Sequence, residues 1–340
     1  MAQDPREHTY RPAWWVPGPH AQTLWGKFAR RAIELPTQME RWSTPDGDFL
    51  DLLRLDAPAD RPRVFLLHGL EGTVRSHYVS GLMSMAHQRG WGADMLVFRG
   101  CGDEPNRARR FYHSGETTDL EFAIHHVIQE FPAAPLLLCG VSLGGNVLLK
   151  WLGERGDSVP SQVRSAVAIS VPFDLERGSR HISQGFARIY ERHFLRTLRR
   201  KAMAKLKRFP DLFDQTALAR ASTLYAFDDV VTGPVHGFRD AHDYYTRSSS
   251  IRFLRGIHRP TLLISARDDP FLPEEVLDEV TAIARANPFL TVEITAHGGH
   301  VGFVGGLPWR PSYYAETRAG EFLASHADSA SSVQALRNRA

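Results

Sequence analysis

Short, continuous runs of apolar residues recur along most of this 340-residue chain. Such runs are typical of strands that are buried on both faces of a parallel sheet. Segments with the apolar spacing of helices lie between them, which indicates βαβ units with helices on both faces of the sheet. The sequence therefore predicts an α/β fold with a mostly parallel central sheet. The expected strands are 64–67, 93–98, 135–141, 163–171, 261–265 and 291–295, and the expected helices are 78–89, 117–131, 146–154, 274–286 and 314–325.

The N-terminal part of the chain has a different pattern. Two strands are expected at 33–41 and 49–55, and the Asp46-Gly47 pair between them is a hairpin turn signal. This hairpin would add antiparallel strands at one edge of the sheet. Residues 12–27 are rich in Trp, Pro and Gly, and we expect them to pack as an irregular arm on the body of the protein, in preference to anchoring a membrane or a lid.

The alternation of strands and helices stops between residues 172 and 255. This stretch is helical in composition and basic, and it contains no buried-strand run. We expect a helical cap inserted between two core strands. The predicted organisation is an aromatic and proline-rich arm (1–31), an α/β core (32–171 and 256–327), the helical cap (172–255) and a disordered tail (328–340).

The charge of the chain is nearly balanced, with a net charge of +3. Eight basic residues cluster in the expected cap, a pattern that fits nucleic acid, an anionic membrane surface or simply a solvated helix face. No zinc-finger, RNA-binding or Walker-type motif accompanies the cluster, so we favour the solvated face and predict no nucleic-acid partner. The cluster consists of Arg192, Arg196, Arg199, Arg200, Lys201, Lys205, Lys207 and Arg208.

Several features indicate a soluble, cytoplasmic protein without a cofactor. The two cysteines, Cys101 and Cys139, do not make a disulfide framework. Residues 1–10 are polar and do not resemble a signal peptide, and no stretch reaches the roughly 18 apolar residues of a spanning helix. The adjacent His125 and His126 would point apart on a helix, and no other zinc-like spacing occurs. We predict neither a metal nor a cofactor, and the sequence carries no signal for the oligomeric state.

The strongest chemical motif is Gly140-Val141-Ser142-Leu143-Gly144, a G-x-S-x-G sequence. It follows an apolar strand and precedes a helix, which is the context that a nucleophile elbow requires. Glycines allow the chain to turn sharply so that the serine hydroxyl projects from the top of the sheet. We predict that Ser142 is a nucleophile and not an idle serine in a structural turn.

A serine hydroxyl needs a base within hydrogen-bond reach. His300 lies in a glycine-flanked loop after the last strand, and we prefer it to His297, which follows that strand too closely to reach Ser142. The base needs an acid to orient it. Asp269, directly before a proline after the seventh strand, is our choice, with Asp268 as the alternative. The order Ser142, Asp269, His300 is the chain order of α/β-hydrolases.

An acyl-transfer enzyme also needs donors for an oxyanion. One should be the backbone N–H of Leu143, directly after the nucleophile. The second should come from the loop after the third strand, His68-Gly69-Leu70-Glu71-Gly72, and we assign it to Leu70. We expect His68 to shape this loop through hydrogen bonds and not to take part in the chemistry.

Longer strings of residues are similar to one branch of the α/β-hydrolases. This is the YheT-like family of bacterial hydrolases, related to the mammalian abhydrolase-domain proteins 1, 2 and 3, and the similarity spans about residues 12–325. It implies carboxylic-ester hydrolysis and a triad at Ser142, Asp269 and His300, and in the mammalian relatives action on acylglycerols or phospholipids. The strings are His68–Gly72, Ser76–Tyr78, Phe98–Gly102, Glu104–Asn106, Tyr112–Thr117, the elbow through Asn146, and Gly299–Phe303. The sequence suggests no role for the Arg99 loop or for residues 113–116.

The residues and the resemblance together predict a serine esterase that works through an acyl-enzyme on a small ester or an acyl-lipid. A thioesterase or another acyl hydrolase would use the same three residues. A non-catalytic binding protein on this scaffold would usually lack one of them. Five cap residues could line an acyl pocket or simply pack within the cap: Phe186, Phe194, Leu195, Leu198 and Phe213.

Overall fold

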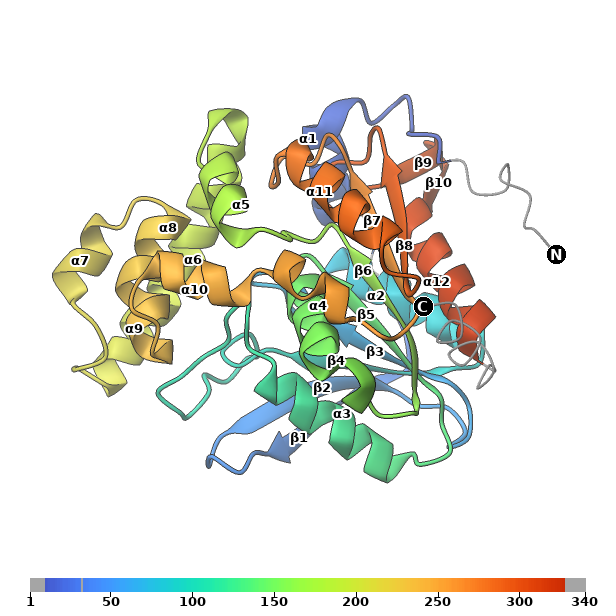
Figure 1. Cartoon of the computed structure of the whole chain (residues 1–340), viewed down its shortest axis with the longest axis horizontal. Coiled ribbons are helices and arrows are strands. Elements are labelled where there is room, and N and C mark those ends of the chain that lie inside the picture. Colours follow the sequence, from blue (N-terminus) through green and yellow to red (C-terminus); the bar gives the residue numbers. More distant parts are fainter. Residues whose placement is uncertain (1–9, 32, 328–340) are drawn as a thin grey trace.

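An eight-stranded sheet forms the centre of the computed structural model, which describes residues 10–31 and 33–327 (Figure 1). Its order is β1-β2-β4-β3-β5-β6-β7-β8. Strands β1 and β2 are antiparallel at one edge, and the strands from β4 to β8 run parallel. The predicted α/β fold with a mostly parallel sheet is confirmed. The strands are β1 (Thr37–Ser43), β2 (Phe49–Leu55), β3 (Arg63–Leu67), β4 (Gly92–Val97), β5 (Leu136–Val141), β6 (Val163–Ile169), β7 (Thr261–Ala266) and β8 (Leu290–Thr295).

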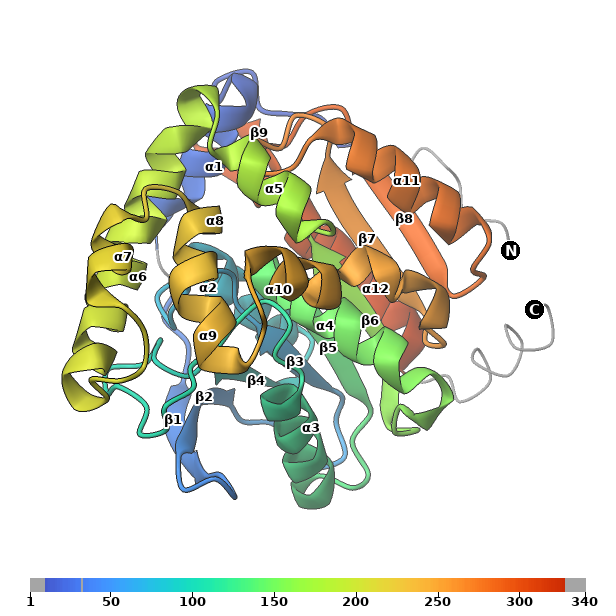
Figure 2. The same cartoon turned by 60° about the vertical axis from the view of Figure 1, so that its left-hand side comes forward.

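Helices cover both faces of this sheet. Helices α2 and α12 pack against each other on one face, and α3 and α4 pack against each other on the opposite face. Figure 2 shows α4 in front of the sheet and α12 behind it. Helix α11 contacts β8. Their bounds are α2 (His77–Gln88), α3 (Thr118–Glu130), α4 (Leu143–Arg155), α11 (Glu274–Arg285) and α12 (Tyr314–Ala327), and a short turn, η1 (Gly156–Ser158), follows α4.

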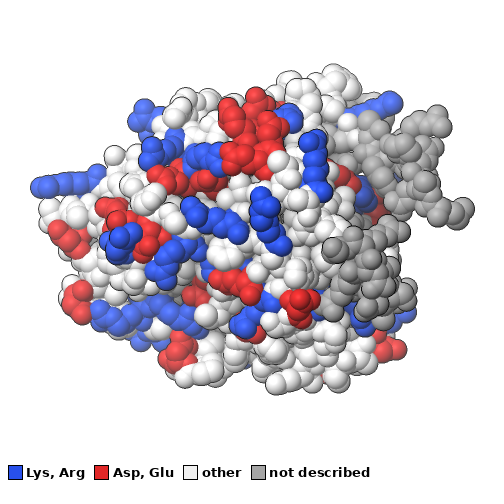
Figure 3. Space-filling view, in the orientation of Figure 1, with Lys and Arg blue, Asp and Glu red and all other residues white. Residues whose placement is uncertain are grey.

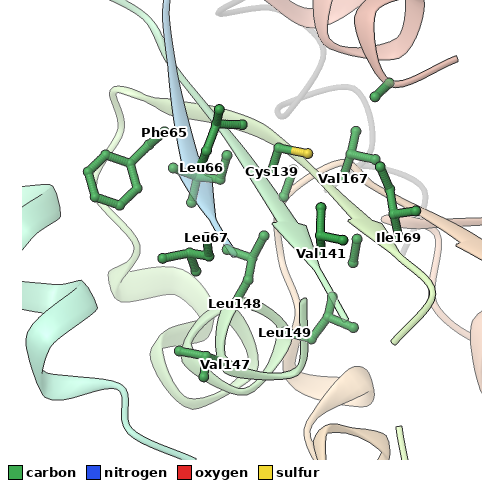
Figure 4. Close-up of a cluster of buried hydrophobic side chains, with 14 of the residues drawn as sticks. Phe65, Leu66, Leu67, Cys139, Val141, Val147, Leu148, Leu149, Val167 and Ile169 are labelled. Atoms are coloured by element: carbon green, nitrogen blue, oxygen red, sulfur yellow. The ribbon is translucent and has the colours of Figure 1, made fainter. Parts of the chain in front are cut away.

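The core is densest around β5, which lies between β3 and β6 in the sheet. Every residue of β3 and β5 is buried. Figure 4 shows Leu66, Cys139 and Val167 side by side on these three strands, with Val147 and Leu148 of α4 packed below them. Burial of this much apolar surface holds the end of β5 and the start of α4 in fixed positions.

The N-terminal arm is more regular than the sequence suggests. Residues Gly18–Ala29 form helix α1, so the expectation of an irregular arm is wrong for this part. Pro17 precedes the helix and Pro19 lies in its first turn, where a missing N–H costs no hydrogen bond. The arm packs on an unpredicted hairpin of β9 (Val304–Leu307) and β10 (Arg310–Tyr313), and the Gln22 side chain bonds both backbone groups of Val304.

Strand β1 also begins later than expected, at Thr37 instead of residue 33. Its ladder with β2 starts at the pair Thr37 and Leu55. The preceding residue, Pro36, has no N–H to donate to a ladder, which explains the later start.

The stretch 172–255, all of which the structure describes, is helical and contains no strand. In Figure 1 helices α6 to α9 form a lobe beside the sheet. Leu195 and Ala202 of helix α6 belong to a small apolar core within the lobe, separate from the core around the sheet. The elements are α5 (Leu175–Ile182), η2 (Gly185–Ala187), α6 (Arg188–Arg208), α7 (Gln215–Arg220), α8 (Leu224–Phe227), η3 (Asp228–Thr232), α9 (Gly233–His236), α10 (Ala241–Ser248), η4 (Ser250–Arg252) and η5 (Leu254–Gly256).

The surface has no single dominant charge on the face seen in Figure 3, where basic and acidic side chains alternate over the lobe and the sheet. Within the described residues, no helix has both the length and the apolar character needed to cross a bilayer.

Candidate active site

Ser142 lies at a sharp turn between β5 and α4. Its backbone has φ of 53° and ψ of −121°, an unfavourable conformation for a residue other than glycine. The turn closes because the neighbours are glycines: a Cβ on Gly144 would lie 2.5 Å from the Leu67 and His68 carbonyl oxygens. The hydrogen bond from the Ser142 N–H to the Ile169 carbonyl (2.8 Å) fixes the turn to the neighbouring strand. The turn therefore holds Ser142 at the end of β5, with its hydroxyl pointing outward from this edge of the sheet.

The three residues predicted from the sequence meet at this edge. The Ser142 Oγ and the His300 Nε2 are 2.9 Å apart, and the His300 Nδ1 and the Asp269 Oδ2 are also 2.9 Å apart. The second oxygen of Asp269 accepts the Phe271 N–H at 2.8 Å, which orients the carboxylate. The side chains of His300 and Asp269 are 10% and 6% exposed, so this chain of hydrogen bonds is shielded from water.

The two alternative residues lie elsewhere. Asp268 accepts the Gly299 N–H at 2.8 Å and is 3.3 Å from the His297 Nδ1. The His297 side chain is 65% exposed. Neither alternative contacts Ser142, and Asp268 instead stabilises the loop that carries His300.

Three residues that the sequence did not single out hold His300 in place. The Phe271 ring stacks on the imidazole with centroids 4.1 Å apart. The Thr23 hydroxyl of α1 accepts the His300 N–H, and the Ser170 hydroxyl accepts the Val301 N–H. Val301 has φ of 60°, so these bonds hold a strained loop. The N-terminal arm therefore contributes directly to the position of His300.

Leu143 and Leu70, the predicted oxyanion donors, both line the cavity above Ser142. Leu143 begins α4, where the first N–H groups of a helix have no intrahelical partner. On either side of Leu70, the Gly69 N–H donates to the Tyr78 hydroxyl (2.9 Å) and the Glu71 N–H donates to the Tyr112 hydroxyl (3.0 Å). The two tyrosines pin the loop at both sides of the Leu70 N–H.

Glu71 connects this loop to helix α6. One oxygen of its carboxylate, Oε1, accepts the Tyr112 hydroxyl and the Lys201 ammonium, each at 2.8 Å. The other oxygen is buried and has no partner within the described chain. Glu71 has φ of 56°, so the loop is strained at the residue that the lysine holds.

His68 has the structural role expected for it. Its Nδ1 lies 2.7 Å from the Gly69 carbonyl oxygen, and its Nε2 accepts the Phe98 N–H. Burial lowers the pKa of His68 to about 4, so the ring is neutral near pH 7.

The two segments without an assigned role also prove to be structural in their contacts. The buried guanidinium of Arg99 pairs with Asp119 through two hydrogen bonds and with Asp48. Residues 113–116 join helix α4 to helix α10, because the Ser114 N–H donates to the Tyr244 hydroxyl and the Ser114 carbonyl accepts a hydrogen bond from the Asn146 amide.

A cavity of about 870 Å³ opens above Ser142 between the sheet edge, helix α1 and the stretch 172–255. Its lining is mainly apolar. Of the five cap residues named as candidates, Phe186, Phe194 and Leu198 line it, whereas Leu195 and Phe213 pack in the small core of the lobe. Within the described residues, no group of three His, Cys, Asp or Glu side chains could hold a metal ion.

Comparisons with known proteins agree with this architecture. The family model described as alpha/beta hydrolase fold matches residues 62–307. The chain is 38% identical over 317 residues to YheT of Escherichia coli (strain K12), whose name provisionally calls it an esterase, and the match covers 92% of each protein. It is 29% identical over 325 residues to the human phospholipase ABHD3, covering 93% of this chain and 78% of that protein.

More distant similarities point to the same fold. The chain is 28% identical over 259 residues to the monoacylglycerol lipase of Saccharomyces cerevisiae, covering 74% of this chain and 56% of that protein. A solved esterase of Pyrococcus furiosus superposes with a TM-score of 0.58 at 19% identity, covering 86% of this chain and 93% of the other.

Proposed function

This chain belongs to the α/β-hydrolase family, in the YheT-like branch, and from this membership and the site geometry we propose that it is a serine hydrolase that cleaves carboxylic esters through an acyl-enzyme. The observation that carries the proposal is the chain of hydrogen bonds from Ser142 through His300 to Asp269 at the floor of an apolar cavity. The names of its relatives, an esterase, a phospholipase and a monoacylglycerol lipase, support an acyl ester as the substrate class.

In the proposed mechanism, the His300 Nε2 takes the proton of Ser142 as its Oγ attacks the ester carbonyl. Asp269 accepts the Nδ1–H of His300, which keeps the ring in the tautomer whose Nε2 can act as a base and stabilises the imidazolium that forms. His300 then gives its proton to the leaving alcohol. Water repeats the sequence on the acyl-enzyme, with His300 again as the base, and releases the acid.

The backbone N–H groups of Leu70 and Leu143 would stabilise the tetrahedral oxyanion. The start of α4 adds the partial positive charge of a helix N-terminus next to Leu143. Donors that are held before the reaction need no reorganisation when charge develops, and removing one such donor typically costs about 3 kcal/mol of transition-state stabilisation. The pinning of Leu70 by two tyrosine hydroxyls supports this role.

We further propose that residues 172–255 act as a substrate-selecting cap over the core formed by 32–171 and 256–327. The cap side chains that line the cavity are largely apolar, which suits an acyl chain or another apolar group of the ester. The expected tail, 328–340, lies outside the described residues. The cytoplasmic location stays a prediction.

The test is hydrolysis of p-nitrophenyl esters with acyl chains from two to sixteen carbons. We expect the wild type to turn over at least part of the series and Ser142→Ala to fall to background, because removing the nucleophile of such a site typically costs a factor of about 10⁶. Ser161→Ala, an exposed serine before β6, is the matched control and should keep full activity.

A fluorophosphonate probe separates an unsuitable ester from an inactive site. Labelling of the wild type and Ser161→Ala, but not of Ser142→Ala, would support an activated Ser142 even with a poor substrate. Hydrolysis that survives in Ser142→Ala at the wild-type rate, or the absence of labelling in all three proteins, would rule out the mechanism.

A further inference from the structure

The cavity contains one carboxylate that no cation accompanies. Within the described residues, two acidic side chains line the cavity, Glu71 and Asp228. Glu71 pairs with Lys201. Asp228 has no ion pair with any lysine, arginine or histidine of the described chain. Its pKa is set by burial and by the hydrogen bonds from Thr232 and Tyr245, with no contribution from a positive charge. Asp228 is half-buried, and a charge that is partly withdrawn from water without an ionic partner is costly, so its presence on a cavity wall calls for an explanation.

Asp228 opens η3, a single π-helical turn in the cap. Its Oδ1 accepts the Thr232 hydroxyl at 2.5 Å and its Oδ2 accepts the Tyr245 hydroxyl at 2.6 Å. An ionised carboxylate offers about four acceptor positions, so these two bonds leave about half of them free. Single π turns inside helical segments occur frequently at functional sites. The two bonds hold the carboxylate in place without neutralising it.

Three aromatic residues line the cavity together with this carboxylate. Phe227, Tyr244 and Tyr245 line the same cavity, and the two tyrosine rings lie 5.0 Å apart, tilted by 39°. These three residues are at most 3% exposed, so packing holds their rings in fixed positions. The negative faces of aromatic rings attract cations, most strongly where water is excluded. Burial raises the pKa of Asp228 to about 6, a cost that a bound cation would offset.

We propose that Asp228, together with Tyr244 and Tyr245, forms a subsite that binds a positively charged alkylammonium group of the substrate. The inference rests on the proposed function, because it names a group carried by the ester that this cavity accepts. A purely structural Asp228 would account for its bonds to Thr232 and Tyr245, but not for its place on the cavity wall. A neutral hydroxyl could use the free acceptor positions, but it would leave the carboxylate charge unbalanced.

The first test compares two ligands that differ in charge alone. Choline and 3,3-dimethylbutan-1-ol have nearly the same shape and the same hydroxyl, but only choline is a cation. Binding of each to the full wild-type chain is measured by ligand-observed NMR titration at pH 7.5. We expect choline to bind about tenfold more tightly, as attraction to a carboxylate and aromatic rings implies. Equal affinities, or no binding of choline, would overturn the proposal.

The second test removes the charge. Asp228→Asn keeps the size of the side chain and can still hydrogen-bond Thr232 or Tyr245. We expect it to lose the preference for choline while the affinity for the neutral alcohol stays within about twofold of the wild type. Asp211→Asn, the same change at a 74% exposed cap residue, should keep the preference. A preference that survives in Asp228→Asn would overturn the assignment to this residue.

The comparison of ligands needs only the wild type, so the proposal can be tested even if Asp228→Asn fails to fold. Neither ligand is an ester, so binding can be read whether or not the protein hydrolyses p-nitrophenyl esters. Ester hydrolysis without a preference for choline would remove the subsite and leave the proposed function intact. A preference for choline without fluorophosphonate labelling of Ser142 would support the subsite and rule out the proposed mechanism.

Discussion

At the scale of single residues, the elbow depends on the space that a missing side chain leaves. A Cβ on Gly144 would lie 2.5 Å from two backbone carbonyl oxygens, which cannot move without shifting β3. We expect Gly144→Ala to lower the free energy of unfolding by about 2–4 kcal/mol and to reduce ester hydrolysis, because Ser142 would shift with the turn. Urea denaturation and the ester assay measure the two effects.

The matched control is Gly47→Ala. Gly47 has φ of 76° in the β1–β2 turn, and a Cβ there would meet no atom within 4 Å. This variant carries only the cost of a left-handed backbone, about 1–2 kcal/mol, and should keep full activity. If the two variants had similar effects on the free energy of unfolding and on ester hydrolysis, the close contact of Gly144 with the two carbonyl oxygens would not explain the need for glycine at the elbow.

The residues of the candidate site differ in how readily a sequence shows them. Ser142 stands in a motif between a strand and a helix, and Asp269 and His300 follow later strands, so their proximity could be predicted. Tyr78 and Tyr112 could not, because a hydroxyl that accepts a distant backbone N–H becomes visible only in the folded chain. Asp228 lies in the cap, where no periodic pattern indicates which side chains face a cavity.

At the scale of elements, one contact joins helix α6 of the cap to the loop of the proposed oxyanion donor. Lys201 reaches the Glu71 carboxylate at 2.8 Å, and Glu71 follows Leu70. We expect Lys201→Met to lower kcat by about tenfold with a smaller change in KM, since a loosened loop would stabilise the transition state less than the bound ester. Steady-state kinetics on a p-nitrophenyl ester give both constants.

Two further variants separate positioning from simple loss of charge. Lys201→Arg keeps the cation and should recover most of kcat. Lys207→Met makes the same change at an exposed position of α6 and should behave as the wild type. If Lys201→Met kept the kcat of the wild type, the cap would not position this loop.

Elements with a clear apolar period could be predicted, and elements rich in Gly, Pro and Trp could not. The buried strands of the sheet and helices α2, α3, α11 and α12 appear near their expected positions, because apolar side chains must repeat with the period of the element. Helix α1 and the hairpin of β9 and β10 escaped prediction. Both are rich in Gly, Pro and Trp, which hides their pattern in the sequence, and they pack on each other, as the bonds between Gln22 and Val304 illustrate.

At the scale of the whole molecule, buried histidines should make the fold sensitive to acid. Burial lowers the pKa of His68 and His236 to about 4 and that of His113 well below its ordinary value of 6.5. Above pH 6.5 these rings are neutral in both the folded and the unfolded chain and contribute nothing. As the pH falls from 6.5 to 4, these histidines bind protons in the unfolded chain but stay neutral in the folded chain. The free energy of unfolding therefore decreases.

His236 allows this effect to be isolated in one residue. Its Nε2 is buried without a hydrogen-bond partner, and its ring packs between Phe111 and His113, so phenylalanine fits its surroundings. At pH 5 a histidine with a pKa of about 4 in the fold and 6.5 unfolded costs on the order of 2 kcal/mol, whereas at pH 7.5 it costs almost nothing.

We therefore expect His236→Phe to match or slightly exceed the wild-type stability at pH 7.5 and to exceed it clearly at pH 5, as measured by urea denaturation at both pH values. Ser161→Ala, at an exposed position without a titratable group, should leave the difference between the two pH values unchanged. If His236→Phe raised the free energy of unfolding by the same amount at both pH values, the cause would be better packing and not the removal of a histidine that protonates only in the unfolded chain. In that case the acid sensitivity of the fold would have to arise from other groups, such as the buried rings of His68 and His113.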